Sequence, residues 1–155
     1  MEKNDFMKIA IDLATDNVRN GGGPFGAVIV RNGEIVATGV NRVTSKNDPT
    51  AHAEVTAIRS ACEKLSTFDL EGFEIYSSCE PCPMCLGAIY WAHLSHLYFA
   101  GTQHDAAKVG FDDAFIYDEL EKDIQHRHLP TVHVNHTESL APFNEWSKKS
   151  DKIEY

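Results

Sequence analysis

Three cysteines, Cys79, Cys82 and Cys85, lie within seven residues of one another, and this cluster constrains the fold more than any other feature of the chain. So tight a spacing cannot form an independent disulfide framework and is more typical of a metal or redox site. The cluster follows a predicted strand at residues 73–77 and opens a predicted helix at residues 82–92. Cys82 and Cys85 therefore share one helix face and can bind one ion, and the helix dipole favours their thiolate forms.

A second motif, His52-Ala53-Glu54, lies near the start of another predicted helix. His52 would add a neutral imidazole to the thiolates of Cys82 and Cys85, which leaves a fourth position open for water, as in catalytic zinc sites. Zinc lowers the pKa of bound water to roughly 7. Glu54 would not bind the metal but would carry the proton from this water to the substrate. Backbone N–H groups around Ala53 would hold the substrate's carbonyl oxygen or ring edge.

Cys79 leaves an alternative open. It could be the fourth ligand of a structural zinc, which would make the chain a non-catalytic zinc scaffold. The carboxylate of Glu54 beside His52 argues against this interpretation, because a structural site has no use for a non-ligating carboxylate. Cys62, in the middle of a predicted helix, is most simply a small core residue.

The length of 155 residues, with 43% hydrophobic and 24% charged residues, indicates a globular protein. We expect a single domain over residues 1–155. The first residues lack the apolar stretch of a secretory signal, and no run reaches the ~18 apolar residues of a membrane span. These absences predict a cytoplasmic location and no membrane partner.

The net charge of -9 comes from 14 Lys and Arg against 23 Asp and Glu. Proteins that bind nucleic acids usually carry a basic face, because neutralising phosphates supplies most of their affinity. The charge balance therefore favours a small, uncharged substrate over a nucleic acid.

Hydrophobic periodicity and turn signals predict helices that alternate with strands. An Asn-Gly pair at Asn32-Gly33 predicts a hairpin. Asp48 and Pro49 predict the N-cap and first position of a helix from about residue 50. This pattern indicates an α/β fold, a three-layer α/β/α sandwich with a central mixed sheet. The predicted helices are 5–19, 50–65, 82–92, one or two within 104–127, and 139–149; the predicted strands are 27–30, 35–40, 73–77, 96–100 and 132–134.

Both metal motifs match the signature of zinc deaminases. With their flanking residues, they resemble bacterial guanine deaminases of the cytidine-deaminase fold. The likeness extends over nearly the whole chain, through segments 23–28, 47–58, 78–92 and 110–117 and the closing Glu154-Tyr155. It implies a hydrolase of purine catabolism that converts guanine to xanthine and ammonia, with zinc hydroxide attacking C2. It also implies one catalytic Zn²⁺ per subunit.

The resemblance implies substrate contacts as well. Phe25 would stack on the purine, Asn41 would bond a ring edge, and Asp113, rather than Asp112, would accept from the base's N–H groups. Tyr155 would close the pocket. Each has a simpler interpretation: Phe25 as core, Asn41 as a strand cap, the two aspartates as a helix N-cap pair, and Tyr155 as an ordinary terminus.

Family members are usually dimers, and exchange of C-terminal segments occurs among them. The resemblance therefore implies a homodimer in which residues from about 130 to 155 act as a lid and are exchanged between subunits. Other deaminases would keep the same zinc ligands and glutamate. The alternatives left open are enzymes for cytosine, a nucleoside, a pterin or a triazine, and an adenosine deaminase acting on transfer RNA.

Overall fold

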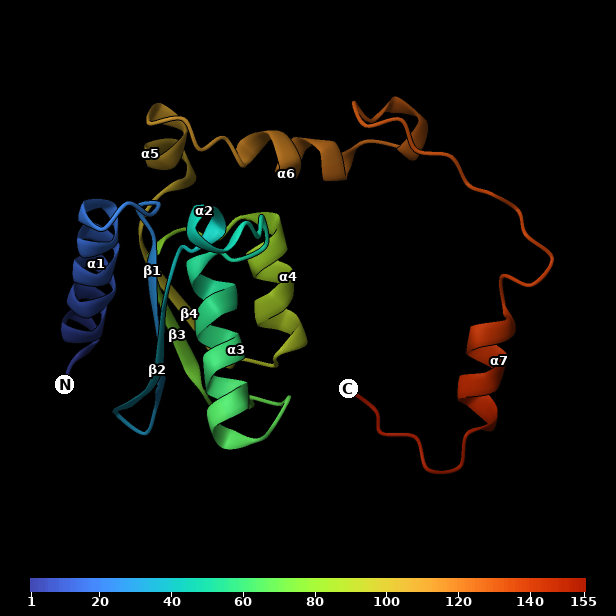
Figure 1. Cartoon of the computed structure of the whole chain (residues 1–155), viewed down its shortest axis with the longest axis horizontal. Helices are drawn as coiled ribbons and strands as arrows, with labels where there is room; N and C mark the ends of the chain where they lie inside the picture. The colour runs from blue at the N-terminus through green and yellow to red at the C-terminus, as the bar shows by residue number, and fades with distance from the viewer. The chain divides into compact units, whose positions relative to one another are not determined.

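The computed structural model describes residues 1–155, which form two compact units, 1–117 and 118–155. A four-stranded sheet of order β2-β1-β3-β4 forms the centre of the first unit (Figure 1). β1 runs antiparallel to both β2 and β3, whereas β3 and β4 are parallel. The sheet is therefore mixed, as predicted. Its strands are β1 (Gly26–Arg31), β2 (Glu34–Val40), β3 (Glu74–Cys79) and β4 (His96–Gly101).

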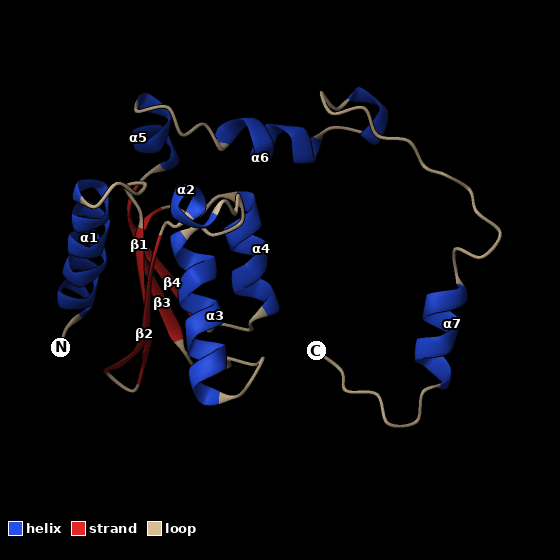
Figure 2. Ribbon diagram, viewed as in Figure 1, coloured by secondary structure: helices blue, strands red, loops and turns tan.

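Helices cover both faces of this sheet (Figure 2). α1 (Lys3–Arg19) packs on one face, against β1 and β3, and α3 (Ala53–Leu65) packs on the other, against β2 and β1. α4 (Pro83–Trp91) lies beside α3. The arrangement confirms the predicted three-layer α/β/α sandwich.

The central strand β1 is apolar on both faces because a helix covers each face. Ala27 and Ile29 belong to the core under α3, and Val28 and Val30 belong to the core under α1. Such a strand is expected to be a continuous hydrophobic run rather than an alternating pattern. The Asn32-Gly33 pair forms the predicted hairpin turn, with both residues at positive φ (51° and 77°).

Gly39 of β2 determines how closely α3 approaches the sheet. A Cβ at this position would overlap the backbone of Ala53 and Ala57. Only glycine permits this approach, which sets the first turn of α3 directly against the strand. The position of the His52-Ala53-Glu54 motif therefore depends on a residue in a different element.

The start of α3 corrects one sequence prediction. The N-cap is His52, and neither Asp48 nor Pro49 belongs to the helix. Asp48 Oδ1 instead accepts hydrogen bonds from the backbone N and the hydroxyl of Thr50. The aspartate therefore closes a local turn, a use of this residue type that competes with helix capping. A short helix that the sequence analysis did not predict, α2 (Val43–Lys46), precedes this turn.

The chain beyond β4 confirms one prediction and contradicts another. Two helices flank Gly110, which has a φ of 99°, so the expectation of one or two helices in this region is confirmed. The predicted strand at 132–134 is wrong: these residues are irregular and exposed. Apolar residues at alternate positions do not make a strand without a partner backbone. The remaining helices are α5 (Gln103–Lys108), α6 (Ala114–Glu121), the 3₁₀ turn η1 (Ile124–His126) and α7 (Ala141–Lys148).

No helix of the chain combines the length and the apolar character needed to cross a bilayer.

Candidate functional site

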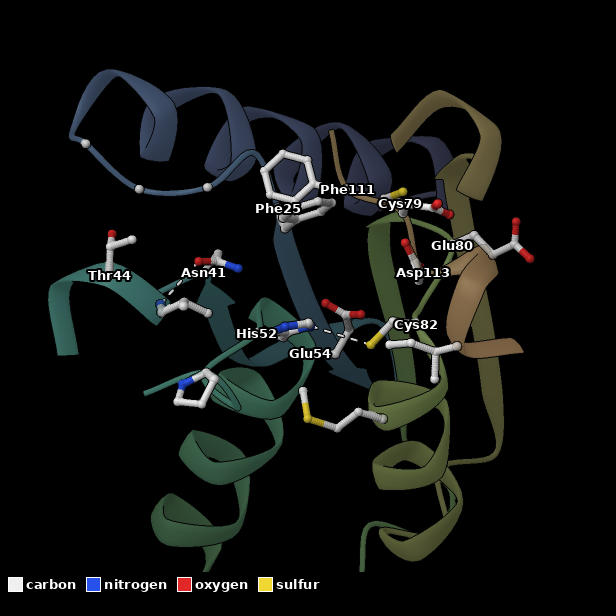
Figure 3. Close-up of a pocket in the computed structure, with 18 residues that line it drawn as sticks. Phe25, Asn41, Thr44, His52, Glu54, Cys79, Glu80, Cys82, Phe111 and Asp113 are labelled. Carbon is white, nitrogen blue, oxygen red and sulfur yellow. Dashed lines mark hydrogen bonds between the residues drawn. The ribbon is translucent and has the colours of Figure 1, made fainter. Parts of the chain in front are cut away.

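The structure brings together the three predicted metal ligands from two helix starts. His52 is the N-cap of α3, Cys82 is the N-cap of α4, and Cys85 lies in the first turn of α4. Their ligand atoms all lie within 4.8 Å of one another. The sulfurs of Cys82 and Cys85 are each 3.5 Å from His52 Nδ1. Both cysteines are buried, and His52 borders the pocket (Figure 3).

These distances fit a tetrahedral zinc ion. Zn–S bonds of about 2.3 Å and Zn–N bonds of about 2.05 Å place sulfur and nitrogen about 3.6 Å apart at the tetrahedral angle. The two observed sulfur–nitrogen distances of 3.5 Å agree with this value. Two thiolates and one imidazole are also a donor set that zinc prefers. An ion held by these three side chains would keep one position for water.

The electrostatics of the cluster favour a bound cation. A hydrogen bond from Cys85, together with one from His52, lowers the pKa of Cys82 to about 4. The same interaction with Cys82 raises the pKa of Cys85, and a hydrogen bond to Cys82 raises the pKa of His52. The three groups thus share protons around one thiolate. A metal ion bound by all three would displace these protons.

Glu54 lies beside the ligands but is not one of the metal-binding cluster. It is 5% exposed, and burial raises the pKa of its carboxyl group. Figure 3 shows the carboxyl group facing into the pocket next to His52 and Cys82. A buried carboxyl group with a raised pKa, close to the place where water would bind, is suited to accept and return a proton.

Cys79 does not join the metal cluster. Its thiol donates to the carbonyl oxygen of Thr102 at 3.6 Å, and burial raises its pKa to about 11. It lines the pocket as a neutral group. The alternative of a structural zinc site with Cys79 as the fourth ligand therefore has no support in the geometry. Cys62 packs against the hydrophobic core, as predicted.

A cavity of about 660 Å³ opens over the ligands and is lined by several of the predicted substrate contacts. Phe25 borders it and also packs against the core, so the two interpretations of this residue are compatible. Its ring meets that of Phe111 edge to face, with centroids 5.0 Å apart. The two rings form an apolar wall on which a flat base could stack.

Asn41 is buried at the edge of the same cavity, with 8% of its surface exposed. Its Oδ1 accepts from the backbone N of Val43 at 3.2 Å, which fixes the rotamer and leaves the NH₂ group facing the pocket (Figure 3). Ala53, in contrast, is fully buried and its side chain does not line the cavity. Its predicted role, which involves only the backbone N–H, stays a prediction.

The two neighbouring aspartates have different surroundings. Asp112 Oδ1 accepts from the backbone N of Phe115 at 3.3 Å, so it helps to begin α6. Asp113 points into the pocket near Cys82 and Glu54 (Figure 3). Burial, and then the negative charge of Cys82, raise the pKa of the Asp113 carboxyl group. Tyr155 belongs to the second unit, so its predicted contact with substrate stays a prediction.

Sequence reasoning missed two residues that shape the pocket, Asn17 and Glu80. Asn17 of α1 donates from Nδ2 to the carbonyl oxygens of Gly23 and Asn41, at 2.8 and 2.9 Å. It thereby links two chain segments that line the pocket. Glu80 lines the pocket and accepts from Gln103 N at 3.1 Å. Both act through long-range contacts, and no local spacing indicates such contacts. Only Glu80 gave a signal, because it adjoins the cysteine motif.

Comparisons with known proteins agree with this site. The family model of the cytidine and deoxycytidylate deaminase zinc-binding region matches residues 1–101. Guanine deaminase of Bacillus subtilis is 53% identical over the whole length of both chains. The X-ray structure of guanine deaminase from Bacillus subtilis superimposes with a TM-score of 0.97 at 52% identity, covering 100% of this chain and 99% of that one.

More distant relatives cover less of the chain. A tRNA-specific adenosine deaminase of Aquifex aeolicus is 42% identical over 64% of this chain and 66% of its own length. A structure of guanine deaminase from Nitrosomonas europaea has a TM-score of 0.70 at 34% identity, covering 72% of this chain and 65% of that one. The family match and the three clustered ligands lead to one conclusion: the chain belongs to the cytidine and deoxycytidylate deaminase family and carries its zinc-binding region.

Proposed function

We propose that the protein hydrolyses free guanine to xanthine and ammonia. One observation carries the substrate assignment: the similarity to guanine deaminase of Bacillus subtilis extends through all 155 residues, beyond the zinc-binding region that ends at residue 101. The segment beyond residue 101 holds Asp113, which borders the pocket. The match to the adenosine deaminase, in contrast, covers only 64% of the chain.

In this proposal, the ligands and the acid–base residue have separate tasks. Zinc bound by His52, Cys82 and Cys85 supplies the Lewis acidity that makes water a nucleophile near neutral pH. Glu54 accepts a proton from the attacking water as the oxygen bonds to C2 of guanine. Glu54 gives this proton to a ring nitrogen, then takes the second proton from the new hydroxyl group at C2 and gives it to the exocyclic amine. The C2–N bond breaks, ammonia leaves, and the ring keeps the oxygen as xanthine.

The pocket residues hold the base in position. Asp113 accepts hydrogen bonds from the base's N–H groups, and the NH₂ group of Asn41 donates to an acceptor on the ring edge. Phe25, supported by Phe111, stacks on the purine face. The backbone N–H at Ala53 donates to the carbonyl oxygen or the ring edge. A site built from such polar contacts rejects analogues that leave them unpaired.

A transfer-RNA substrate is a further alternative, since a tRNA-specific adenosine deaminase is 42% identical over 64% of this chain. The net charge of -9 argues against it, because binding to RNA depends on neutralising phosphates.

We also propose that the chain works as a cytoplasmic homodimer in purine catabolism. Residues 1–155 would act as one deaminase domain, with the segment from about 130 as a lid that carries Tyr155 and is exchanged between subunits. The composition of the second unit supports the exchange. Its large apolar side chains are exposed in the single chain, and burying them against another subunit would be favourable. They are Leu120, Ile124, Leu129, Val132, Val134, Leu140, Phe143, Trp146, Ile153 and Tyr155.

Ammonia release from a panel of free bases tests the function. Zinc-loaded protein is incubated with guanine, cytosine, guanosine and a triazine, and the Glu54→Ala variant is assayed in parallel. Guanine is expected to be deaminated fastest, and Glu54→Ala to slow the reaction by about 10²- to 10⁴-fold. Glu63→Ala, an exposed glutamate of the same helix, is the matched control and should keep its rate. Inert guanine, with cytosine or guanosine turned over, would refute the substrate but not the chemistry.

A further inference from the structure

Tyr117 connects the segment that carries Asp113 to the metal loop, by which we mean residues 79–82, directly before and including Cys82. Its hydroxyl donates to the carbonyl oxygen of Pro81 at 2.7 Å, and the contact is partly buried. Pro81 immediately precedes Cys82, the N-cap of α4 and one of the three clustered ligands. The hydrogen bond therefore joins α6 to the turn of the chain from which Cys82 extends.

Tyr117 is also one helical turn after Asp113. The backbone N of Tyr117 donates to the carbonyl oxygen of Asp113 at 3.2 Å. The aspartate that faces the pocket and the tyrosine that holds Pro81 thus lie at the two ends of one hydrogen-bonded turn. A shift of the Tyr117 backbone relative to Pro81 would therefore move Asp113 relative to the metal ligands.

The chain before α6 turns at Gly110, which has a φ of 99°, and α6 contains no buried residue. Phe111 contacts Phe25 on the far side of the pocket, and Asp112 bonds the backbone of Phe115 within the segment itself. Since neither contact reaches the metal loop, the hydroxyl of Tyr117 is placed to fix the distance between Asp113 and the zinc site.

We propose that Tyr117 is a positioning residue for base recognition: through Pro81, it holds Asp113 at the distance from the metal centre that the substrate requires. The inference rests on the proposed function, in which Asp113 contacts the base. Tyr117 itself does not touch the reacting atoms. Removing its hydroxyl should therefore weaken the contact between Asp113 and the base and leave the zinc ligands in place.

A double-mutant cycle on the full-length, zinc-loaded protein tests this role. The values of kcat and KM for guanine are measured for the wild type, Tyr117→Phe, Asp113→Ala and the double variant. Tyr117→Phe should lower kcat/KM by about tenfold, the effect of one hydrogen bond, with an unchanged zinc content. In the Asp113→Ala background the same change should have less than about a twofold effect, because residues that act as one unit are not additive.

Two further measurements separate positioning from general stability. Amide hydrogen exchange should become faster at residues 111–117 in Tyr117→Phe and stay unchanged in α3. Tyr76→Phe removes a hydroxyl from the core under α1, away from the pocket, and should leave kcat/KM unchanged. An equal loss from Tyr117→Phe in both backgrounds, or no loss in either, would overturn the proposal. A wild type inert with guanine would refute the proposed function instead, and the same cycle on the base that it does deaminate would then decide the role of Tyr117.

Discussion

At the residue scale, the candidate metal centre consists of three side chains, His52, Cys82 and Cys85, whose ligand atoms already lie at distances that suit one ion. The sulfur–nitrogen distances of 3.5 Å match a tetrahedral site, and the thiolate of Cys82 is favoured before any metal binds. These three side chains would hold the ion, and no fourth His, Cys, Asp or Glu belongs to the cluster. Losing any one of them leaves two ligands, too few to retain zinc.

Replacing Cys85 with alanine should therefore reduce the bound zinc to well below one ion per chain. Because a bound metal stabilises the folded state by mass action, the melting temperature should fall as well. Zinc is measured by elemental analysis of the purified protein. Cys62→Ala is the matched control, since Cys62 packs against the core away from the cluster. A Cys85→Ala variant with a full complement of zinc would show that the ion lies elsewhere.

The residues that could be predicted from the sequence are those with local spacing. His52 and Glu54 are two apart, and Cys82 and Cys85 are three apart, so their motifs are visible in the chain itself. Asn17 gave no such signal, because its partners are Gly23 and Asn41, the latter 24 residues away. A hydrogen bond between distant segments depends on the tertiary fold, and one sequence does not specify it.

At the element scale, the close packing of α3 against the sheet positions His52 and Glu54 of the candidate metal site. Gly39 lies against the backbone of Ala53 and Ala57, in the first turns of the helix that carries Glu54. The hydrophobic periodicity of the sequence predicted most of the helices and strands, and most of their boundaries were predicted to within a few residues. The start of α3 was not, because Asp48 has two competing uses, as a helix cap and as a turn residue, and the local sequence does not decide between them.

Gly39→Ala should destabilise the protein by about 1–3 kcal/mol, the usual effect of overpacking. It should also lower zinc affinity, because the added methyl group pushes the start of α3 away from the sheet. Chemical denaturation and zinc titration measure the two effects. Gly87→Ala is the control: Gly87 lies within α4 with open space around it, so the substitution should stabilise the helix by up to about 1 kcal/mol. Equal effects of the two substitutions would contradict the packing argument.

The hydrogen bonds of Asp105 at the start of α5 predict that the stability of the protein depends on pH. Hydrogen bonds from the backbone and hydroxyl of Thr102 lower the pKa of Asp105 below its ordinary value of 3.8. A carboxyl group with a lowered pKa in the folded state stabilises the protein above its unfolded pKa. This stabilisation is lost as the pH falls through the folded value. Asp105→Asn should therefore destabilise the protein at pH 7 more than in acid, as measured by thermal melts across that range. A destabilisation that stays constant with pH would contradict the assignment.

At the scale of the whole molecule, the two units differ in how they bury apolar surface. Residues 1–117 have cores on both faces of the sheet, whereas residues 118–155 expose most of their large apolar side chains. The layered architecture of the first unit could be predicted because alternating strands and helices allow few arrangements. The strand predicted at 132–134 was wrong because the residues that a segment packs against are not visible in its own sequence.

Deleting the last residues through Tyr155 tests the proposed lid. The truncated protein should bind zinc as before but turn over guanine at least about tenfold more slowly, because water would enter the open site. Zinc content, steady-state kinetics and the mass in solution are measured together, and the full-length protein should have the mass of a dimer. Unchanged kinetics after truncation would show that the terminus does not close the pocket.

Incubation with guanine in water labelled with heavy oxygen tests the central claim most directly. The zinc-loaded protein should convert guanine to xanthine that carries one labelled oxygen, with one ammonia released for each xanthine formed. The Glu54→Ala variant should form almost none. Guanine left unchanged by the wild type, or xanthine formed without the label, would contradict hydrolytic deamination at this centre.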